Sequence, residues 1–133
     1  MTIKKKISIK NVSFGKNVTI IEPVNLYNCK IGNNCFIGPF VEIQEGSIIG
    51  DNTRIQSHSF ICSKVKIGKN CFIGHGVKFV NDKFLKNKLT KDKKKLLNTL
   101  VGSNVLIGSN STILPVAIKN NIVIGAGSVV TKD

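Results

Sequence analysis

The chain has 133 residues, a length that suits one domain with a core of moderate size. Its 20 Lys and Arg residues outnumber its 7 Asp and Glu residues, and the formal net charge of +13 favours anionic partners such as nucleic acids, acidic lipids or phosphorylated small molecules. It contains no run of about 18 apolar residues, and no apolar segment follows the basic start at residues 4–6, which argues against a membrane span and a secretory signal, so we expect a cytoplasmic protein.

A regular pattern begins after the basic, loosely patterned residues 1–13, which we expect to form a lead-in strand or a cap. From Phe14 onward, an aliphatic or aromatic residue recurs at about every sixth position. Between Ile31 and Phe79 the spacing of six is unbroken, with these anchors: Ile31, Ile37, Ile43, Ile49, Ile55, Ile61, Ile67, Ile73 and Phe79. Neither an α-helix nor a single β-strand has this period, so the pattern indicates a structural repeat.

Three six-residue units make one triangular coil, in which each unit supplies a short strand and a corner. Gly and Asn gather at the predicted corners, as at residues 32–34 and 50–52, where the backbone angles are demanding. The predicted coils are residues 14–30, 31–48, 49–66, 67–84, 101–117 and 118–133. The sequence therefore predicts one all-β domain over residues 1–133, a parallel β-helix of about six triangular coils.

The repeat is interrupted between the fourth and fifth coils. Residues 85–99 include six lysines and have no six-residue register. We predict one extruded, lysine-rich loop at about residues 85–100, with room for a short helix around residues 91–97. Insertions of this kind in repeat proteins often serve binding.

The residue before each anchor is predicted to point outward. On the first face these outward residues are mostly apolar: Thr19, Phe36, Arg54, Phe72, Leu106 and Val123. On the second face they are more mixed: Asn25, Glu42, Phe60, Lys78, Thr112 and Val129. A contiguous apolar strip on a surface indicates a subunit interface, so we expect a homo-oligomer that uses the first face.

The four cysteines show no CxxC spacing, and Cys35 and Cys71 occupy the same small-residue position of the repeat. A disulfide framework or a zinc site is therefore weakly supported. We expect reduced cysteines that pack in the core, and no bound metal.

Two stretches carry a more specific pattern than the repeat, namely IQSHSFIC at residues 55–62 and FIGHGVKFVND at residues 72–82. They resemble the N-acetyltransferases of nucleotide-linked amino sugars within the hexapeptide-repeat acyltransferase superfamily. The stretches GSNSTILP at 108–115 and IGAGSVVTKD at 124–133 resemble the coenzyme A end of that superfamily. The resemblance implies a left-handed winding, an exception to the usual right-handed crossover, and a homotrimer with sites between its subunits.

The resemblance also implies an activity: acetyl transfer from acetyl-CoA to the amine of a dTDP- or UDP-linked amino sugar, with 3-amino sugars of surface polysaccharides, such as lipopolysaccharide, as the nearest case. The partners would be coenzyme A and the nucleotide sugar. Such a reaction requires that the amine lose a proton, that it be held near the thioester, and that a donor meet the charge that develops on the thioester oxygen.

Histidine suits the role of base because its ordinary pKa is about 6.5. The chain has only two, His58 and His75, and both lie in the second unit of their coils. We therefore expect both imidazoles near one edge, on adjacent coils, and we take both as candidate catalytic residues.

Further site residues follow from the resemblance. Asn81, at the corner after Phe79, could bind the sugar or the thioester oxygen, or could be a plain turn residue. The implied substrate-binding residues are Gln56, Asp82 and Lys83, and the implied coenzyme A residues are Gly108 and Ala126 for the pantetheine arm and Lys132 for a phosphate.

Two departures from the superfamily pattern stand out. Relatives often read Leu-Pro-Gly-Val, whereas Pro115 is followed directly by Val116 here. Many also continue past the Thr-Lys-Asp ending, so we expect part of the usual coenzyme A surround to be absent.

Three other functions compete with N-acetylation of an amino sugar. One is O-acetylation of a sugar or another small acceptor by the same scaffold. Another is a non-enzymatic, basic β-helical protein that binds nucleic acid, but no aromatic residues alternate with the lysines, so we expect no nucleic-acid partner. A metal-dependent protein resembling the carbonic-anhydrase-like members would need three histidine ligands, and the chain has two.

Overall fold

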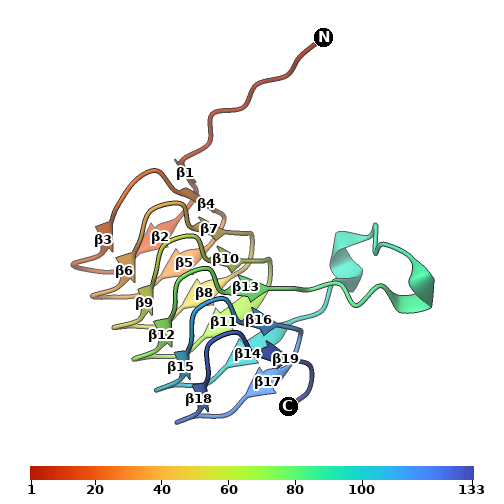
Figure 1. Ribbon diagram of the computed structural model, residues 1–133. Helices are drawn as coiled ribbons and strands as arrows, with labels where there is room; N and C mark the ends of the chain where they lie inside the picture. Colours follow the sequence, from red (N-terminus) through yellow and green to blue (C-terminus); the bar gives the residue numbers. More distant parts are fainter.

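The computed structural model describes residues 1–133 and shows a triangular solenoid built from three parallel sheets (Figure 1). Sheet A contains β1 (Ile9–Lys10), β4 (Asn25–Tyr27), β7 (Glu42–Ile43), β10 (Phe60–Ile61), β13 (Lys78–Phe79), β16 (Thr112–Ile113) and β19 (Val129–Val130). Sheet B contains β2 (Ser13–Phe14), β5 (Lys30–Ile31), β8 (Ile48–Ile49), β11 (Val65–Ile67), β14 (Thr99–Val101) and β17 (Ala117–Ile118). Sheet C contains β3 (Thr19–Ile20), β6 (Phe36–Ile37), β9 (Arg54–Ile55), β12 (Phe72–Ile73), β15 (Leu106–Ile107) and β18 (Val123–Ile124).

The chain visits the sheets in the order B, C, A and then advances by one coil, which is the left-handed parallel β-helix that the sequence resemblance implied. Each anchor pairs with the anchor one coil away, for example Ile31 with Ile49 and Ile37 with Ile55. The predicted coils are therefore confirmed. Sheet A gains an additional strand because β1 pairs with β4, so a lead-in strand does precede the six coils.

The core is a single column of aliphatic side chains inside the triangle. The anchors from Ile31 to Phe79 are at most 2% exposed, and the small residues of each unit fill the remaining space. At several of these positions a buried hydroxyl bonds the next coil, as Ser47 does to the Cys62 carbonyl and Thr53 to the Gly68 carbonyl, whereas the buried Thr99 hydroxyl has no partner. These bonds satisfy polar groups that the core would otherwise leave unpaired.

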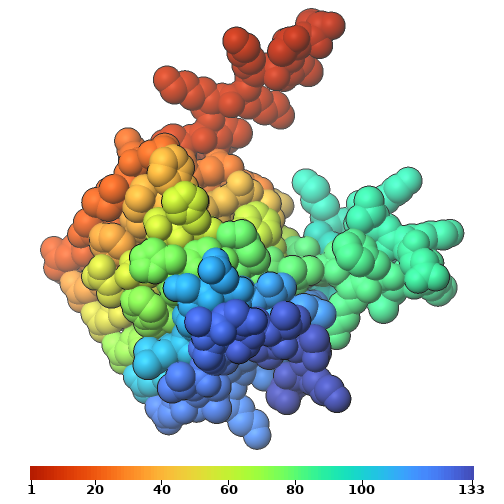
Figure 2. Space-filling model, viewed as in Figure 1, coloured from red at the N-terminus to blue at the C-terminus, as the bar shows by residue number.

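The interruption of the repeat is an extruded segment, as predicted, and it connects β13 to β14. We call residues 82–98 the arm; it stands out from the solenoid in Figures 1 and 2, as does the N-terminal tail. It contains two short 3-10 turns, η1 (Leu85–Asn87) and η2 (Lys93–Lys95). The second lies within the predicted helical stretch. The arm leaves the ladder intact, since Val65, Lys66 and Ile67 of β11 pair with Thr99, Leu100 and Val101 of β14.

The outward column of the first face lies on sheet C, and its residues point away from the core as predicted. Leu106 is 47% and Val123 is 73% exposed, while Phe36 and Phe72 are half-buried. The guanidinium of Arg54 lies over the Phe36 ring, 4.1 Å from its centre. No helix in the structure has both the length and the apolar character needed to cross a membrane.

Candidate active site

Both histidines lie on the edge where the chain passes from sheet C to sheet A, which we call the C–A edge. His58 is in the turn 56–59 and His75 is in the turn 74–77 of the next coil. The two turns are joined by a hydrogen bond from the Gly76 N–H to the Ser57 carbonyl, 3.0 Å long. Both histidines are exposed. The structure thus places the two histidines on one edge and on adjacent coils, as the repeat predicted.

The two histidines differ in how they are held. His58 has a φ of +65° and its ring stacks on Phe40, with the ring centres 5.0 Å apart. His75 sits between Gly74 and Gly76, and all the backbone polar groups from residue 74 to residue 77 are hydrogen-bonded. The backbone around His75 is therefore fixed, while its side chain projects to the surface.

Glycine is needed on either side of His75 for two different reasons. A Cβ on Gly74 would lie 2.8 Å from the Ile107 carbonyl oxygen, because the next coil passes directly over this turn. Gly76 has a φ of +68°, in the left-handed region that glycine adopts without strain. The two glycines of the GHG sequence are therefore required by the fold, Gly74 by coil stacking and Gly76 by its backbone angle.

Lys78 also contacts this edge. The sequence predicts it only as an outward residue of the second face. Its ammonium reaches back across the corner and donates hydrogen bonds to the carbonyls of His58 and, at 3.4 Å, of Gly76. It places a positive charge beside both histidine turns. The signal that could have found it is its outward position in the strand that directly follows the His75 turn.

Gly108 and Ala126 lie on the same edge, on the next two coils. The Asn110 N–H bonds the His75 carbonyl at 2.9 Å, and the Gly127 N–H bonds the Ser109 carbonyl at 2.9 Å, so the turns form one continuous column. A Cβ on Gly108 would lie 2.4 Å from the Ala126 nitrogen. The predicted coenzyme A turns are therefore in line with His75. Lys132 is not in line with His75. It follows β19, whereas the turns of this column precede the strands of sheet A, so it lies at the opposite end of the strands.

Asn81 also lies away from the histidines, on the edge where the chain passes from sheet A to sheet B, the A–B edge. Its amide donates to the Ser63 hydroxyl at 2.7 Å. The whole of β13 separates this corner from the His75 turn. Gln56, by contrast, is half-buried and shares its turn with His58. One chain thus places His75 and Asn81 on opposite edges of sheet A.

Asp82 has its carboxylate engaged within the arm. It accepts hydrogen bonds from the Thr90 N–H at 2.7 Å, the Thr90 hydroxyl at 2.9 Å and the Phe84 N–H at 3.0 Å. These bonds, those from the Thr90 and Phe84 N–H groups foremost, lower the pKa of Asp82 below its usual value. The neighbouring Lys83 is exposed. Asp82 therefore folds the first half of the arm.

Lys64 holds the second half of the arm. Its ammonium donates to the carbonyls of Lys93 at 3.0 Å, Leu96 at 3.4 Å and Lys94 at 3.5 Å, which end the η2 turn. Positive charge at the C-terminal end of a helical turn is favourable because the free carbonyls gather there. The arm is thus folded on itself by Asp82 and attached to the solenoid by Lys64.

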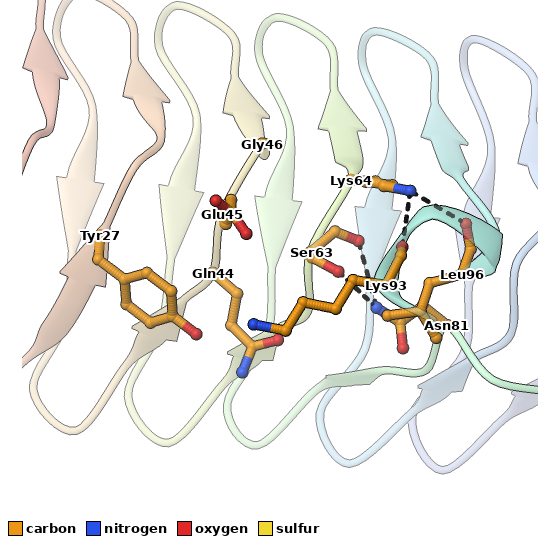
Figure 3. Close-up of a pocket in the computed structure, with 9 residues that line it drawn as sticks. All are labelled: Tyr27, Gln44, Glu45, Gly46, Ser63, Lys64, Asn81, Lys93 and Leu96. Atoms are coloured by element: carbon orange, nitrogen blue, oxygen red, sulfur yellow. Dashed lines mark hydrogen bonds between the residues drawn. The ribbon is translucent and has the colours of Figure 1, made fainter. Parts of the chain in front are cut away.

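A pocket of about 420 Å³ opens beneath the arm on the A–B edge (Figure 3). The side chains of Tyr27, Gln44 and Lys93 extend into the same space, and the lining also includes Glu45, Asn81 and Leu96. Burial, helped by Glu42 and Glu45, raises the pKa of Tyr27, which keeps its hydroxyl protonated and able to donate a hydrogen bond.

All four cysteines are free and buried, as predicted. Burial raises the pKa of Cys29 to about 11 and that of Cys62 to about 12, so neither forms an appreciable thiolate at neutral pH. No three His, Cys, Asp or Glu side chains come close enough together to hold a metal ion.

Two family models match the sequence. Residues 28–63 match the bacterial transferase hexapeptide (six repeats), and residues 64–77 and 99–132 match the hexapeptide repeat of succinyl-transferase. Together they account for most of the solenoid and omit the arm.

Among curated proteins, the bifunctional protein GlmU of Buchnera aphidicola is 32% identical over 135 residues, covering 94% of this chain and 29% of that protein. The corresponding protein of Clostridium botulinum is 39% identical over 105 residues, covering 78% of this chain and 21% of that protein. The chain thus spans less than a third of these relatives.

Among solved structures, a mutant of AntD, an N-acyltransferase from Bacillus cereus in complex with dTDP and coenzyme A, is 25% identical, with a TM-score of 0.69 and coverage of 91% of this chain and 74% of that chain. A mutant of the perosamine N-acetyltransferase of Caulobacter crescentus, in complex with CoA and GDP-perosamine, superimposes with a TM-score of 0.63 at 16% identity, over 92% of this chain and 46% of that chain. At 16% identity, the similarity to the perosamine N-acetyltransferase shows a shared fold only.

Proposed function

Because the chain belongs to the hexapeptide-repeat transferase superfamily, we propose that it is an acetyl-CoA-dependent N-acetyltransferase whose acceptor is the amine of a nucleotide-linked sugar. The observation that carries the proposal is the column of turns on the C–A edge, in which the exposed His75 is in line with Ser109 and Ala126. The likeness to an N-acyltransferase that binds dTDP and coenzyme A supports the choice of donor and acceptor class.

His75 would act as the general base. The acceptor nitrogen attacks the thioester carbonyl carbon and forms the C–N bond, while His75 takes the proton that this nitrogen loses. The C–S bond then breaks, coenzyme A leaves as its thiolate, and the proton passes to the sulfur. Histidine is suited to both transfers because its ordinary pKa of about 6.5 lies near neutrality.

Lys78 would assist from beside the same turn. An ammonium has three N–H donors. Two of those of Lys78 bind the backbone carbonyls of His58 and Gly76, which leaves one for a substrate. The positive charge so fixed favours the negative charge that develops on the thioester oxygen, and it attracts the phosphates of both substrates. His58 and Gln56, on the preceding turn, would contact the acceptor.

We propose that the active sites lie between subunits of a homotrimer. Within one chain, His75 and Asn81 lie on opposite edges of sheet A, so a site that uses both needs two chains. The exposed apolar column of sheet C offers a contact surface. The arm projects from the same edge of the solenoid as Asn81, so in the homotrimer it would lie against a neighbour, with Asn81 and Lys83 beside that neighbour's acceptor site.

The proposal is tested by a thiol-release assay with acetyl-CoA and a pair of matched acceptors. A dTDP- or UDP-linked amino sugar is expected to release coenzyme A, whereas the sugar with a hydroxyl in place of the amine is not. Release with the hydroxyl sugar alone would replace N-acetylation by O-acetylation. If neither acceptor releases coenzyme A, this acceptor class is wrong.

A further inference from the structure

A buried hydroxyl lies directly inside the turn that carries His75. Ser59 belongs to the preceding coil and is 1% exposed. Its Oγ donates to the Gly74 carbonyl at 2.7 Å and accepts from the Val77 N–H at 3.3 Å. These two groups are the first and last of the turn 74–77, so one side chain connects both ends of the turn from the core side.

The turn has no other partner for those two groups. Gly74 and Val77 are buried, so water cannot take the place of the Ser59 hydroxyl. A buried carbonyl or N–H without a partner is unfavourable and is rare in native proteins. Without the hydroxyl, the turn would have to shift until both groups found new partners.

Hydrogen bonds decide the shape of this turn more than packing does. Gly74 and Gly76 flank His75 and have no side chains to pack, and glycine permits many backbone angles. The next coil binds His75 itself. The His75 N–H donates to the Ser109 hydroxyl at 3.2 Å, and the His75 carbonyl accepts from the Asn110 N–H at 2.9 Å. On the core side, the corresponding partner is Ser59.

We infer that Ser59 is a positioning residue for the reaction: by fixing both ends of the 74–77 turn, it sets the direction in which His75 presents its imidazole to the acceptor. The inference rests on the proposed role of His75 as base. Ser59 itself touches no reacting atom. Its effect is on the geometry of the base, to which acyl transfer is sensitive because the reacting atoms must be held in near-attack positions.

The repeat supplies a matched control on another corner. Thr53 makes the same pair of bonds between sheets B and C, where its Oγ1 donates to the Gly68 carbonyl at 3.0 Å and accepts from the Cys71 N–H at 3.2 Å. It is fully buried, and the turn that it holds carries neither a histidine nor the arm. Thr53→Val removes the same hydroxyl chemistry as Ser59→Ala.

The experiment measures kcat and KM by thiol release, together with hydrogen exchange of single backbone amides by NMR. Ser59→Ala is expected to speed exchange at Val77 and to lower kcat by about 10- to 100-fold, with KM within about twofold. Thr53→Val is expected to speed exchange at Cys71 and to leave kcat within about twofold. Ser59→Thr retains the hydroxyl, in a position of the repeat where Thr53 already fits, and is expected to restore kcat.

Two outcomes would overturn the inference: unchanged exchange at Val77 in Ser59→Ala, or an equal fall of kcat in Ser59→Ala and Thr53→Val, which would indicate general loosening of the solenoid. His75→Asn, measured in parallel, separates this inference from the proposed function. A normal kcat in His75→Asn removes His75 as base. A low kcat in His75→Asn with a normal kcat in Ser59→Ala contradicts only the positioning role.

Discussion

At the scale of single residues, the structure separates two histidines that the sequence treats alike. His58 stacks on the Phe40 ring, so its imidazole has an aromatic neighbour on one side. His75 lies between two glycines in a turn whose backbone groups are all bonded. A general base needs a fixed backbone and a free ring, and His75 meets both requirements more fully.

We expect His75→Asn to lower kcat by about 10²- to 10⁴-fold, the usual contribution of a general base. Asparagine cannot take up the amine proton at neutral pH, although it retains a polar group of similar reach. The acceptor KM is expected to change much less than kcat. Steady-state kinetics with saturating acetyl-CoA would measure both constants.

The control for this substitution is His58→Asn, which is expected to affect acceptor binding more than turnover. The two variants together assign the base by their contrast. A large fall of kcat in His58→Asn, with His75→Asn near normal, would transfer the role of base from one histidine to the other.

The positions of the histidines could be predicted from the sequence because a strict repeat converts residue number into place on the solenoid. Gly108 and Ala126, which only the family resemblance indicated, lie on that edge in the structure. The sequence could not predict that Lys78 reaches back over the corner, because its reach depends on a side-chain rotamer rather than on the repeat. Nor could it predict the bonds of Asp82, which depend on the path of the arm.

At the scale of elements, the arm is a folded segment with one set of bonds inside it and another to the solenoid. Asp82 fixes its first half through Thr90 and Phe84, and Lys64 fixes the carbonyls at the end of η2. Its place and its lysine-rich character could be predicted, since the six-residue register stops at one point and resumes at another. Its 3-10 turns could not be predicted closely, because three residues give no periodic pattern to read.

The fold of the first half of the arm is expected to depend on pH. The folded pKa of Asp82 is lowered below 3.8 by hydrogen bonds to its charged form, so its contribution to the arm is fully present above that value. The contribution is lost as the pH falls through the folded pKa. Limited digestion by an acid-active protease, or the Thr90 amide signal in NMR, would therefore report opening of the arm only in strongly acidic solution.

Asp82→Asn is expected to open the first half of the arm at neutral pH, because a neutral amide accepts hydrogen bonds more weakly than a carboxylate. Trypsin would then cut more readily at the arm lysines. Asp51→Asn is the matched control: the Asp51 carboxylate accepts a 2.8 Å bond from the Asn33 N–H, on the edge between sheets B and C, whereas the arm leaves the solenoid between sheets A and B. Equal cleavage of both variants would argue against the role of Asp82 in folding the arm.

At the scale of the whole molecule, the fold leaves one face of the solenoid unusually apolar. The outward column of sheet C runs from Phe36 through Phe72 to Leu106 and Val123, with Arg54 as its charged member. Chain topology and burial follow from the sequence because every unit repeats one pattern. The assembly is a matter of complementarity between two copies, and one chain's pattern shows only which face is available.

We expect Phe72→Glu to dissociate the proposed homotrimer, because it places a charge in the middle of that column, where the contact with a second copy would bury it. Native mass spectrometry or light scattering would measure the change from trimer to monomer. Phe60→Glu is the matched control, with the same residue type at the same position of the repeat but on sheet A. Dissociation by Phe60→Glu alone would move the interface to sheet A.

The continuous column of turns on the C–A edge has a consequence for how such a site can change. Successive turns are separated by the spacing of hydrogen-bonded strands, about 4.8 Å, so His75 and Ala126 are about 10 Å apart, two coils along the axis. A substitution changes which side chain stands at a given level, but it cannot adjust the distance between levels. In this architecture the span between the proposed base and the proposed donor site is therefore a whole number of coils, and a longer or shorter span requires the gain or loss of an entire coil.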